Sequence, residues 1–201
     1  MCLVLTLCFD PLSALAQVTA YPNKPVRIIV PFPAGGSADT LVRVVGQNLS
    51  KRWSQSVIID NKPGGGTVIA GALAAKSPAD GYTLLVIANS LTINAKLRTN
   101  LPYDSLRAFE PVAQLVISPQ VIAVQSVSPY KTLADLLRDA KAKPGALSYS
   151  TVGPATTQHI AGEALKRVTG ADFTYAAFTG GGLAANAVSG GHVTMVLTNL
   201  N

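Results

Sequence analysis

The sequence predicts an α/β fold in which strands and helices alternate along the chain. Three observations predict it: short, β-branched apolar runs, glycine-rich turns directly after them, and helical segments after most of those turns. Hydrophobic residues make up 48% of the 201 residues and charged residues 13%, so the chain can bury a core. Alternation of this kind implies parallel sheets with right-handed crossovers.

The first strand and the turn after it form the clearest unit. Residues 26–30 are mostly apolar and β-branched, which is typical of a parallel strand covered on both faces. Gly35 and Gly36 permit a tight turn, Ser37 is a good N-cap, and Asp39 falls in the first turn of the expected helix. A helix that begins here presents free N–H groups to an anion. The alternative interpretation is a turn that binds nothing.

The remaining elements follow in the same alternating order. We expect strands at residues 57–60, 82–87, 147–151, 173–178 and 193–197, and helices at about 37–52, 67–76, 132–143, 159–170 and 182–190. The apolar stretch 109–124, broken at Ser118-Pro119, is interpreted as two strands that bridge two domains. We therefore expect a first domain at 21–119 and a second at 120–201.

Residues 1–20 resemble a secretory leader. The apolar part is too short to span a bilayer, and Ala14-Leu15-Ala16 resembles a cleavage site before Gln17, although no basic residue precedes the apolar part. Both cysteines, Cys2 and Cys8, fall in this leader, which leaves none for a disulfide, a thiolate nucleophile or a metal in the rest of the chain. We predict export to a bacterial periplasm.

The charge pattern argues against a nucleic-acid partner. Sixteen Lys and Arg against ten Asp and Glu give a net charge of +6, but the basic residues are scattered, with no basic stripe or interleaved aromatics. An anionic small molecule needs only a local field, so it fits this composition better.

An enzyme would need a group of catalytic residues that the sequence lacks. It has two histidines, His159 and His192, and contains no Gly-x-Ser-x-Gly, His-Glu-x-x-His, dinucleotide-binding or P-loop pattern. Its carboxylates are dispersed. The sequence therefore predicts no cofactor and no metal, and His159 is interpreted as a capping or packing residue rather than a base.

A repeated strand–turn–helix junction remains. Junctions rich in Gly, Ser and Thr occur at residues 35–37, 89–90, 153–157 and 179–182. Ligands of open α/β sheets bind at the carboxyl ends of strands. If two junctions lie in each domain, they face each other across a cleft and hold carboxylates by N–H and hydroxyl donors.

Several segments carry a family resemblance. The most specific segment is Tyr21-Pro22-x-Lys24-Pro25-Val26-Arg27-x-Ile29-Val30-Pro31-Phe32-Pro33-x-Gly35-Gly36-x-x-Asp39. Further segments that match the same family are residues 61–64 (NKPG), 78–85 (PADGYTLL), 149–153, 180–182 and 190–193. They resemble the tripartite tricarboxylate transporter receptors, the Bordetella uptake gene (Bug) solute-binding proteins.

The resemblance implies a type II periplasmic binding fold, with two Rossmann-like domains around a cleft that closes over a carboxylated metabolite. It implies a monomer that delivers its ligand to a membrane permease of the tripartite tricarboxylate type, without catalysis or metal. The family's binding loops correspond to Phe32, Pro33, Ala34, Gly35, Gly36, Ser37, Asp39, Asn89, Ser90, Thr151, Gly153, Thr156, Thr157, His159, Thr179 and Gly180.

The sequence also departs from the family pattern. Ala155 stands where glycine is usual, residues 177–180 read Ala-Phe-Thr-Gly in place of Pro-Tyr-Lys-Gly, and Thr194 replaces a common Asp. Family members continue further and return to complete the first domain, so we expect this chain to be a fragment with an incomplete first domain. Two alternatives to a receptor remain: an enzyme of the same fold class that uses His159 as its base on an anionic substrate, and a truncated product without function.

Overall fold

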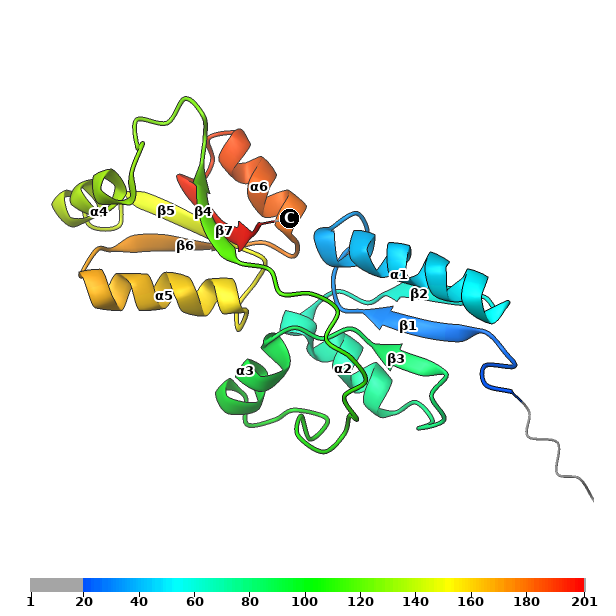
Figure 1. The fold of residues 1–201 in the computed structure, drawn as a ribbon. Coiled ribbons are helices and arrows are strands. Elements are labelled where there is room, and N and C mark those ends of the chain that lie inside the picture. Colours follow the sequence, from blue (N-terminus) through cyan, green and yellow to red (C-terminus); the bar gives the residue numbers. More distant parts are fainter. Residues whose placement is uncertain (1–19, 201) are drawn as a thin grey trace, which may run out of the picture.

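The computed structural model describes residues 20–200, in which seven strands form two separate sheets (Figure 1). The three-stranded sheet has the order β2-β1-β3, with β1 at Val26–Val30, β2 at Val57–Asn61 and β3 at Thr83–Leu85. The four-stranded sheet has the order β4-β7-β5-β6, with β4 at Gln120–Val124, β5 at Leu147–Thr151, β6 at Phe173–Ala177 and β7 at Met195–Asn199.

The helices of the described residues alternate with these strands, as the sequence predicts. They are α1 (Ser37–Trp53), the short 3-10 helix η1 (Gly65–Thr67), α2 (Val68–Ala75), α3 (Ser90–Leu97), α4 (Leu133–Ala142), α5 (Thr157–Thr169) and α6 (Gly181–Ser189). We call the three-stranded sheet with α1, α2 and α3 the first lobe, and the four-stranded sheet with α4, α5 and α6 the second lobe.

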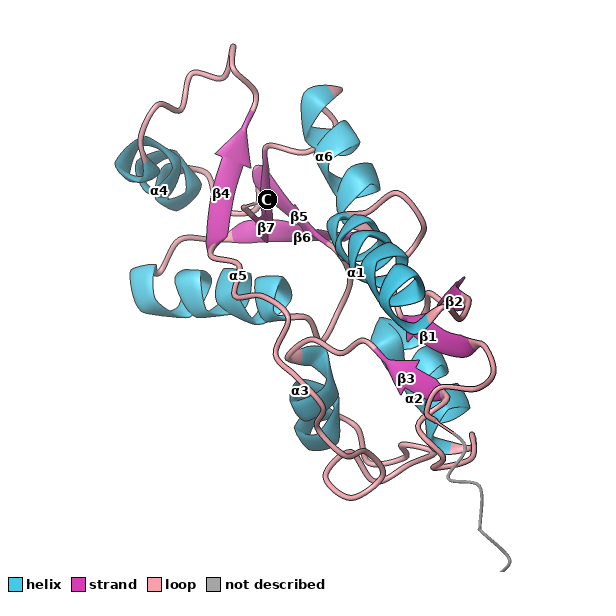
Figure 2. Ribbon diagram, turned by 45° about the vertical axis from the view of Figure 1, so that its right-hand side comes forward, coloured by secondary structure: helices cyan, strands magenta, loops and turns pink. Residues whose placement is uncertain are grey.

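The first lobe confirms the parallel arrangement. Strand β1 lies in the middle and pairs in parallel with both β2 and β3. Helices α1 and α2 lie on opposite sides of the sheet (Figure 2), so β1 is buried on both faces. Ile28 and Val30 pack with Val42 of α1, while Ile29, which points to the other face, is 0% exposed.

The second lobe has a core on each face of its sheet. Tyr149, Phe173 and Met195 pack with α4 and α5 on one face, and Val196 packs with Ala184 and its neighbours in α6 on the other. A capping box begins α4, because the Thr132 hydroxyl accepts from the Asp135 N–H and the Asp135 carboxylate accepts from the Thr132 N–H.

The expected bridge of two strands over 109–124 is wrong. Only β4 is a strand, and it pairs antiparallel with β7 as part of the second sheet. Residues 109–119 form no strand or helix, and Val112 and Ile117 are 81% and 84% exposed, since no neighbouring strand pairs with them in the described residues.

Four strands differ in their bounds from the sequence-based prediction, and of these β2 ends at Asn61, one residue later than expected. The strand expected at 193–197 is β7, two residues later, because residues 190–194 turn before the chain reaches the register that pairs Met195 with Tyr149. The strand expected at 82–87 shortens to β3 at both ends. It pairs with β1 along one edge only. Strand β6 ends at Ala177, one residue earlier than expected.

Some predictions stay open. The leader at residues 1–20 falls outside the described residues apart from Ala20, and the division into domains at residues 119 and 120 stays a prediction. Within residues 20–200, every helix is too short or too polar to cross a membrane.

Gly162 tests the core on the α5 face of the second sheet. A Cβ at Gly162 would lie 2.7 Å from Cζ of the fully buried Tyr149 ring. We expect Gly162→Ala to lower the free energy of unfolding by roughly 1–3 kcal/mol, the usual cost of overpacking. The measurement is urea unfolding followed by circular dichroism.

The matched control is Gly182→Ala in α6, where a Cβ would meet no atom within 4 Å. Alanine there should be neutral or stabilising, because it restricts the unfolded chain more than glycine does. Equal unfolding midpoints for the two variants would contradict the packing described for Tyr149.

Candidate functional site

The carboxyl ends of the parallel strands of both sheets face each other, and helices α1, α5 and α6 begin at the region between the lobes (Figure 1). Two contacts join the lobes there. A Cβ on Gly180 would lie 3.0 Å from Cγ of Pro33, and a Cβ on Gly66 would lie 3.1 Å from the carbonyl oxygen of Pro154. The structure therefore brings the β1–α1 turn to the β6–α6 turn, and η1 to the β5–α5 turn.

Asp39 fixes the β1–α1 turn. Its carboxylate is buried and accepts hydrogen bonds from the Gly35 N–H (2.8 Å), Arg43 Nε (2.8 Å) and Asn61 Nδ2 (2.9 Å). The Arg43 hydrogen bond, helped by the Gly35 and Asn61 donors, holds the pKa of Asp39 at about 2 against the burial that opposes it. Both oxygens are occupied by the first lobe itself, so Asp39 holds the loop in place.

The prediction that Ser37 is the N-cap of α1 is wrong. Gly36 takes that position, with an extended backbone and no side-chain cap, and Ser37 is the first helical residue and exposed. Asp39 bonds the Gly35 N–H, upstream of the helix, so the N–H groups of the first turn of α1 have no side-chain acceptor among residues 20–200. Phe32, Pro33 and Ala34 form the rest of this loop, with Asn61 Nδ2 donating to the Phe32 carbonyl at 3.0 Å.

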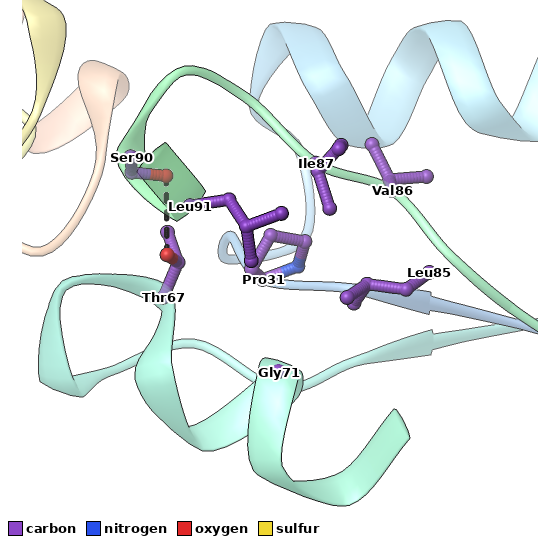
Figure 3. A pocket seen from close by; sticks show the side chains of 8 residues that line it. All are labelled: Pro31, Thr67, Gly71, Leu85, Val86, Ile87, Ser90 and Leu91. Carbon is purple, nitrogen blue, oxygen red and sulfur yellow. Dashed lines mark hydrogen bonds between the residues drawn. The ribbon is translucent and has the colours of Figure 1, made fainter. Parts of the chain in front are cut away.

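Ser90 is buried beside η1. Thr67 Oγ1 donates to Ser90 Oγ at 3.1 Å across one end of a small cavity (Figure 3). Pro31, Leu85 and Leu91 are among the apolar residues that line this cavity. It holds about 10 Å³, space for about one water molecule, so it is not a ligand site. Asn89 precedes α3 and is exposed.

The β5–α5 turn is held by threonine hydroxyls. Thr156 Oγ1 donates to the Gly153 carbonyl at 2.8 Å and accepts from the His159 N–H at 3.3 Å, so Thr156 is the N-cap of α5. Thr151 Oγ1 accepts from the Gly153 N–H at 3.3 Å and lies 3.1 Å from the Tyr175 hydroxyl. Thr157 begins the helix.

Two positions in this region have unusual surroundings. Ala155, where the resemblance has glycine, is buried at a left-handed φ of +57°, a conformation that costs an L-residue roughly 1–2 kcal/mol. The His159 ring packs against Tyr175 with centroids 4.4 Å apart, and its Nδ1 is buried without a hydrogen-bond partner among the described residues. The His159 ring thus packs, as expected, but Thr156 and not His159 caps the helix, and the described residues place no carboxylate to orient Nδ1.

The β6–α6 turn repeats the pattern of the β1–α1 turn. Gly180 is the N-cap of α6, with an extended backbone and no side-chain cap, and Thr179 before it is exposed. Two glycine-capped helices, α1 and α6, therefore begin on either side of the Pro33–Gly180 contact. Their first-turn N–H groups and partial positive charges favour an anion. Among the described residues, no group of three His, Cys, Asp or Glu side chains is placed to hold a metal.

The predicted residues divide into two sets. One set lies in or directly beside the turns that meet between the lobes: Pro33, Gly36, Ser37, Gly153, Thr179 and Gly180. In the other set, the side chains form hydrogen bonds within their own lobe: Asp39, Ser90, Thr151 and Thr156. Sequence reasoning missed Asn61, Arg43 and Tyr175. The four-residue spacing of Asp39 and Arg43 was a usable signal for an ion pair on one helix face, but the role of Tyr175 depends on the register of β5 with β6.

A second cavity, larger than the one beside Ser90, lies in the second lobe. It has a volume of about 340 Å³ and is lined by Ser128, Tyr130, Ser148 and His192, among others. Ser148 is near the amino end of β5, so this cavity is at the edge of the second sheet away from the turns described above.

Comparisons with known proteins give a family match. The family model for the tripartite tricarboxylate transporter family receptor matches residues 41–201. A curated relative, a UPF0065 protein of Bordetella bronchiseptica, is 36% identical over 187 residues, which cover 92% of this chain and 55% of the relative. The chain thus spans about half the length of that relative.

Solved structures of periplasmic binding proteins also resemble this chain. Rpa4515 of R. palustris with adipate is 31% identical with a TM-score of 0.86, over 90% of this chain and 60% of that one. MatC from Rhodopseudomonas palustris with bound malate is 26% identical with a TM-score of 0.79, over 89% and 61% of the two chains.

The pH dependence of stability tests the role of Asp39. A carboxylate with a pKa lowered by folding stabilises the fold above its unfolded pKa, and this stabilisation is lost as the pH falls toward the folded value. For Asp39 the window runs from 3.8 down to about 2. We expect Asp39→Asn to cost about 2 kcal/mol of unfolding free energy near neutral pH, and most of this difference from the natural chain should disappear as the pH falls through about 2.

Denaturant unfolding at a series of pH values measures this difference. Asp172→Asn is the control, since that carboxylate is 55% exposed and lies 3.6 Å from Lys166, and an ion pair with a solvent-exposed carboxylate contributes little. A constant difference between Asp39→Asn and the natural chain from neutral pH to pH 2 would contradict the assignment.

Proposed function

Because the chain belongs to the tripartite tricarboxylate transporter receptor family, we propose that it is an extracytoplasmic solute-binding receptor that captures a small carboxylate between its two lobes. The observation that carries the proposal is the meeting of α1 and α6, two helices with glycine N-caps and no side-chain caps, across the Pro33–Gly180 contact.

Backbone donors at these turns suit a carboxylate. The N–H groups of a helix's first turn point along the axis toward an anion, and the helix dipole adds a partial positive charge. The buried carboxylate of Asp39, beside the β1–α1 turn, is neutralised by Arg43 and accepts two further hydrogen bonds, so it offers little repulsion to a bound anion. Ser37 and Thr179 contribute exposed hydroxyls beside those N–H groups.

Relatives with bound carboxylates support the ligand class. One solved relative carries adipate and another carries malate, and both overlay on about nine-tenths of this chain. The chain covers about 60% of each of them, so the ligand of the whole protein is part of the proposal. The net charge of +6 agrees with an anionic ligand.

The proposed contacts use all four junctions of the predicted site. On the first lobe they are residues 32–37, Asn89 and Ser90, with Asp39 holding the loop. On the second lobe they are Thr151, Gly153, Thr156, Thr157, His159, Thr179 and Gly180. The proposed partner is a membrane permease of the same transporter, reached by a monomeric receptor exported to the periplasm.

An enzyme of the same fold class remains the second hypothesis, with His159 as its base. The packing of His159 against Tyr175 favours a structural role for that ring. The two hypotheses differ in one measurable property, because a receptor binds its ligand saturably and returns it unchanged. Recovery of altered adipate or malate after incubation, abolished by His159→Ala, would favour the enzyme.

A proline substitution at the start of α1 tests the proposed backbone donors. Ser37→Pro removes one N–H group at the first helical position, where proline is well tolerated, and Gly36 before it already has an extended backbone. We expect adipate or malate affinity to fall roughly tenfold, the value of one hydrogen bond to a charged group, with the unfolding midpoint nearly unchanged.

Isothermal titration calorimetry measures the affinity, and Ser37→Ala is the matched control because it keeps the N–H and removes only the hydroxyl. A Ser37→Pro protein that binds as tightly as the natural chain would exclude this amide from the site. Absence of saturable binding to any of a panel of mono-, di- and tricarboxylates would overturn the proposed function.

A further inference from the structure

Gly180 lies where the two lobes touch. It is buried, and a Cβ placed on it would lie 3.0 Å from Cγ and 3.4 Å from Cδ of Pro33 in the first lobe. Contacts this short require one side to move. The space for a side chain at Gly180 is therefore already filled by a residue of the other lobe.

The backbone does not require glycine at this position. Gly180 has φ −169° and ψ 158°, an extended conformation that every residue type adopts. Gly66, at the second contact between the lobes, differs, since its φ of +64° favours glycine whatever its neighbours are. Gly180 thus isolates the effect of the missing side chain from any effect on backbone conformation.

Pro33 has little freedom to move away. Its loop is tied to β2 through Asn61, which donates to the Phe32 carbonyl at 3.0 Å and to Asp39 at 2.9 Å. Asp39 in turn holds the Gly35 N–H at 2.8 Å, so the segment is fixed on both sides of Pro33. A side chain at position 180 would therefore push the lobes apart more readily than it would displace the loop.

We propose that Gly180 is a positioning residue whose missing side chain lets the lobes approach until Pro33 meets the start of α6, and that this contact sets the width of the ligand site. The proposal rests on the proposed function. A ligand held by N–H groups of α1 and α6 together needs both sets within hydrogen-bond reach, and N–H···O bonds form over a narrow range of about 2.7–3.2 Å and prefer a nearly straight angle. Widening the contact then costs affinity without removing any donor.

Graded substitutions test this inference. Gly180→Ala adds the Cβ, and Gly180→Val adds two further methyl groups in a conformation that suits valine. We expect adipate affinity to fall about threefold for alanine and roughly tenfold or more for valine. The control, Gly182→Ala, lies two residues further along the same turn, keeps its amide and fills open space, so it reports any effect of alanine on the helix start.

A second substitution on the opposite lobe separates spacing from ligand contact. Pro33→Ala removes Cγ and Cδ and keeps Cβ, which lies 3.8 Å from the added atom. If the substitutions act through the lobe spacing, Pro33→Ala restores most of the affinity lost in Gly180→Ala. Additive losses in the double variant would overturn the proposal, because they would indicate independent contacts of each residue with the ligand.

A direct distance measurement does not depend on ligand binding. Spin labels on cysteines introduced at Gln47 in α1 and Ala185 in α6, both exposed, report the lobe separation by pulsed electron paramagnetic resonance, with Cys2 and Cys8 replaced by serine. We expect a longer mean distance in Gly180→Val than in the natural chain, and recovery with Pro33→Ala.

The two proposals fail in different ways. If the natural chain binds no carboxylate, the proposed function fails. The distance between the spin labels at positions 47 and 185 then decides by itself whether Gly180 sets the lobe spacing. If carboxylates bind but the distance is the same in the natural chain and in Gly180→Val, the role of Gly180 in setting the lobe spacing is wrong.

Discussion

The buried carboxylate of Asp39 is the interaction on which the rest of the site depends. It joins three parts of the first lobe, because its partners lie in the β1–α1 turn, on α1 itself and at the end of β2. With the turn held in this way, α1 has Gly36 as its N-cap and free N–H groups in its first turn, and Pro33 contacts Gly180 of the second lobe. Loss of this one carboxylate would loosen both the anion-binding end of α1 and the contact between the lobes. The low pKa of Asp39 keeps it ionised throughout the physiological range, so the turn is not expected to respond to pH there.

Local patterns in the sequence were sufficient to predict most of the fold. The β-branched run at β1, the helix at 132–143 and the end of α5 at Gly170 depend on residues close in sequence, and the structure has each of them close to where it was expected. Features that depend on distant partners were not predictable. The antiparallel pairing of β4 with β7 needs the end of the chain, and an apolar run such as 109–119 looks the same whether or not a neighbouring strand exists to pair with it. For the same reason the sequence indicated the four turns but not which of their side chains already have hydrogen-bond partners. Asp39 is hydrogen-bonded to Arg43, and Ser90 to Thr67.

The site relies on backbone more than on charged side chains. Both helices at the Pro33–Gly180 contact have a glycine N-cap and lack side-chain caps, whereas α5, which follows the β5–α5 turn, is capped by Thr156. Main-chain donors recognise the geometry of a carboxylate and are indifferent to the rest of the molecule, which agrees with solved relatives that carry ligands as different as adipate and malate. Selectivity among carboxylates would then depend on how far apart the lobes hold their donors.

The most direct test of the account is to see which amides respond to a carboxylate. Titration of the ¹⁵N-labelled protein with adipate, followed by amide chemical shifts, reports every N–H group at once. The account predicts that the largest shifts occur at the start of α1, at the start of α6 and in the β5–α5 turn, on both sides of the contact between Pro33 and Gly180. Shifts confined to one lobe, or centred on the cavity beside Ser128 and His192, would contradict a carboxylate site between the lobes.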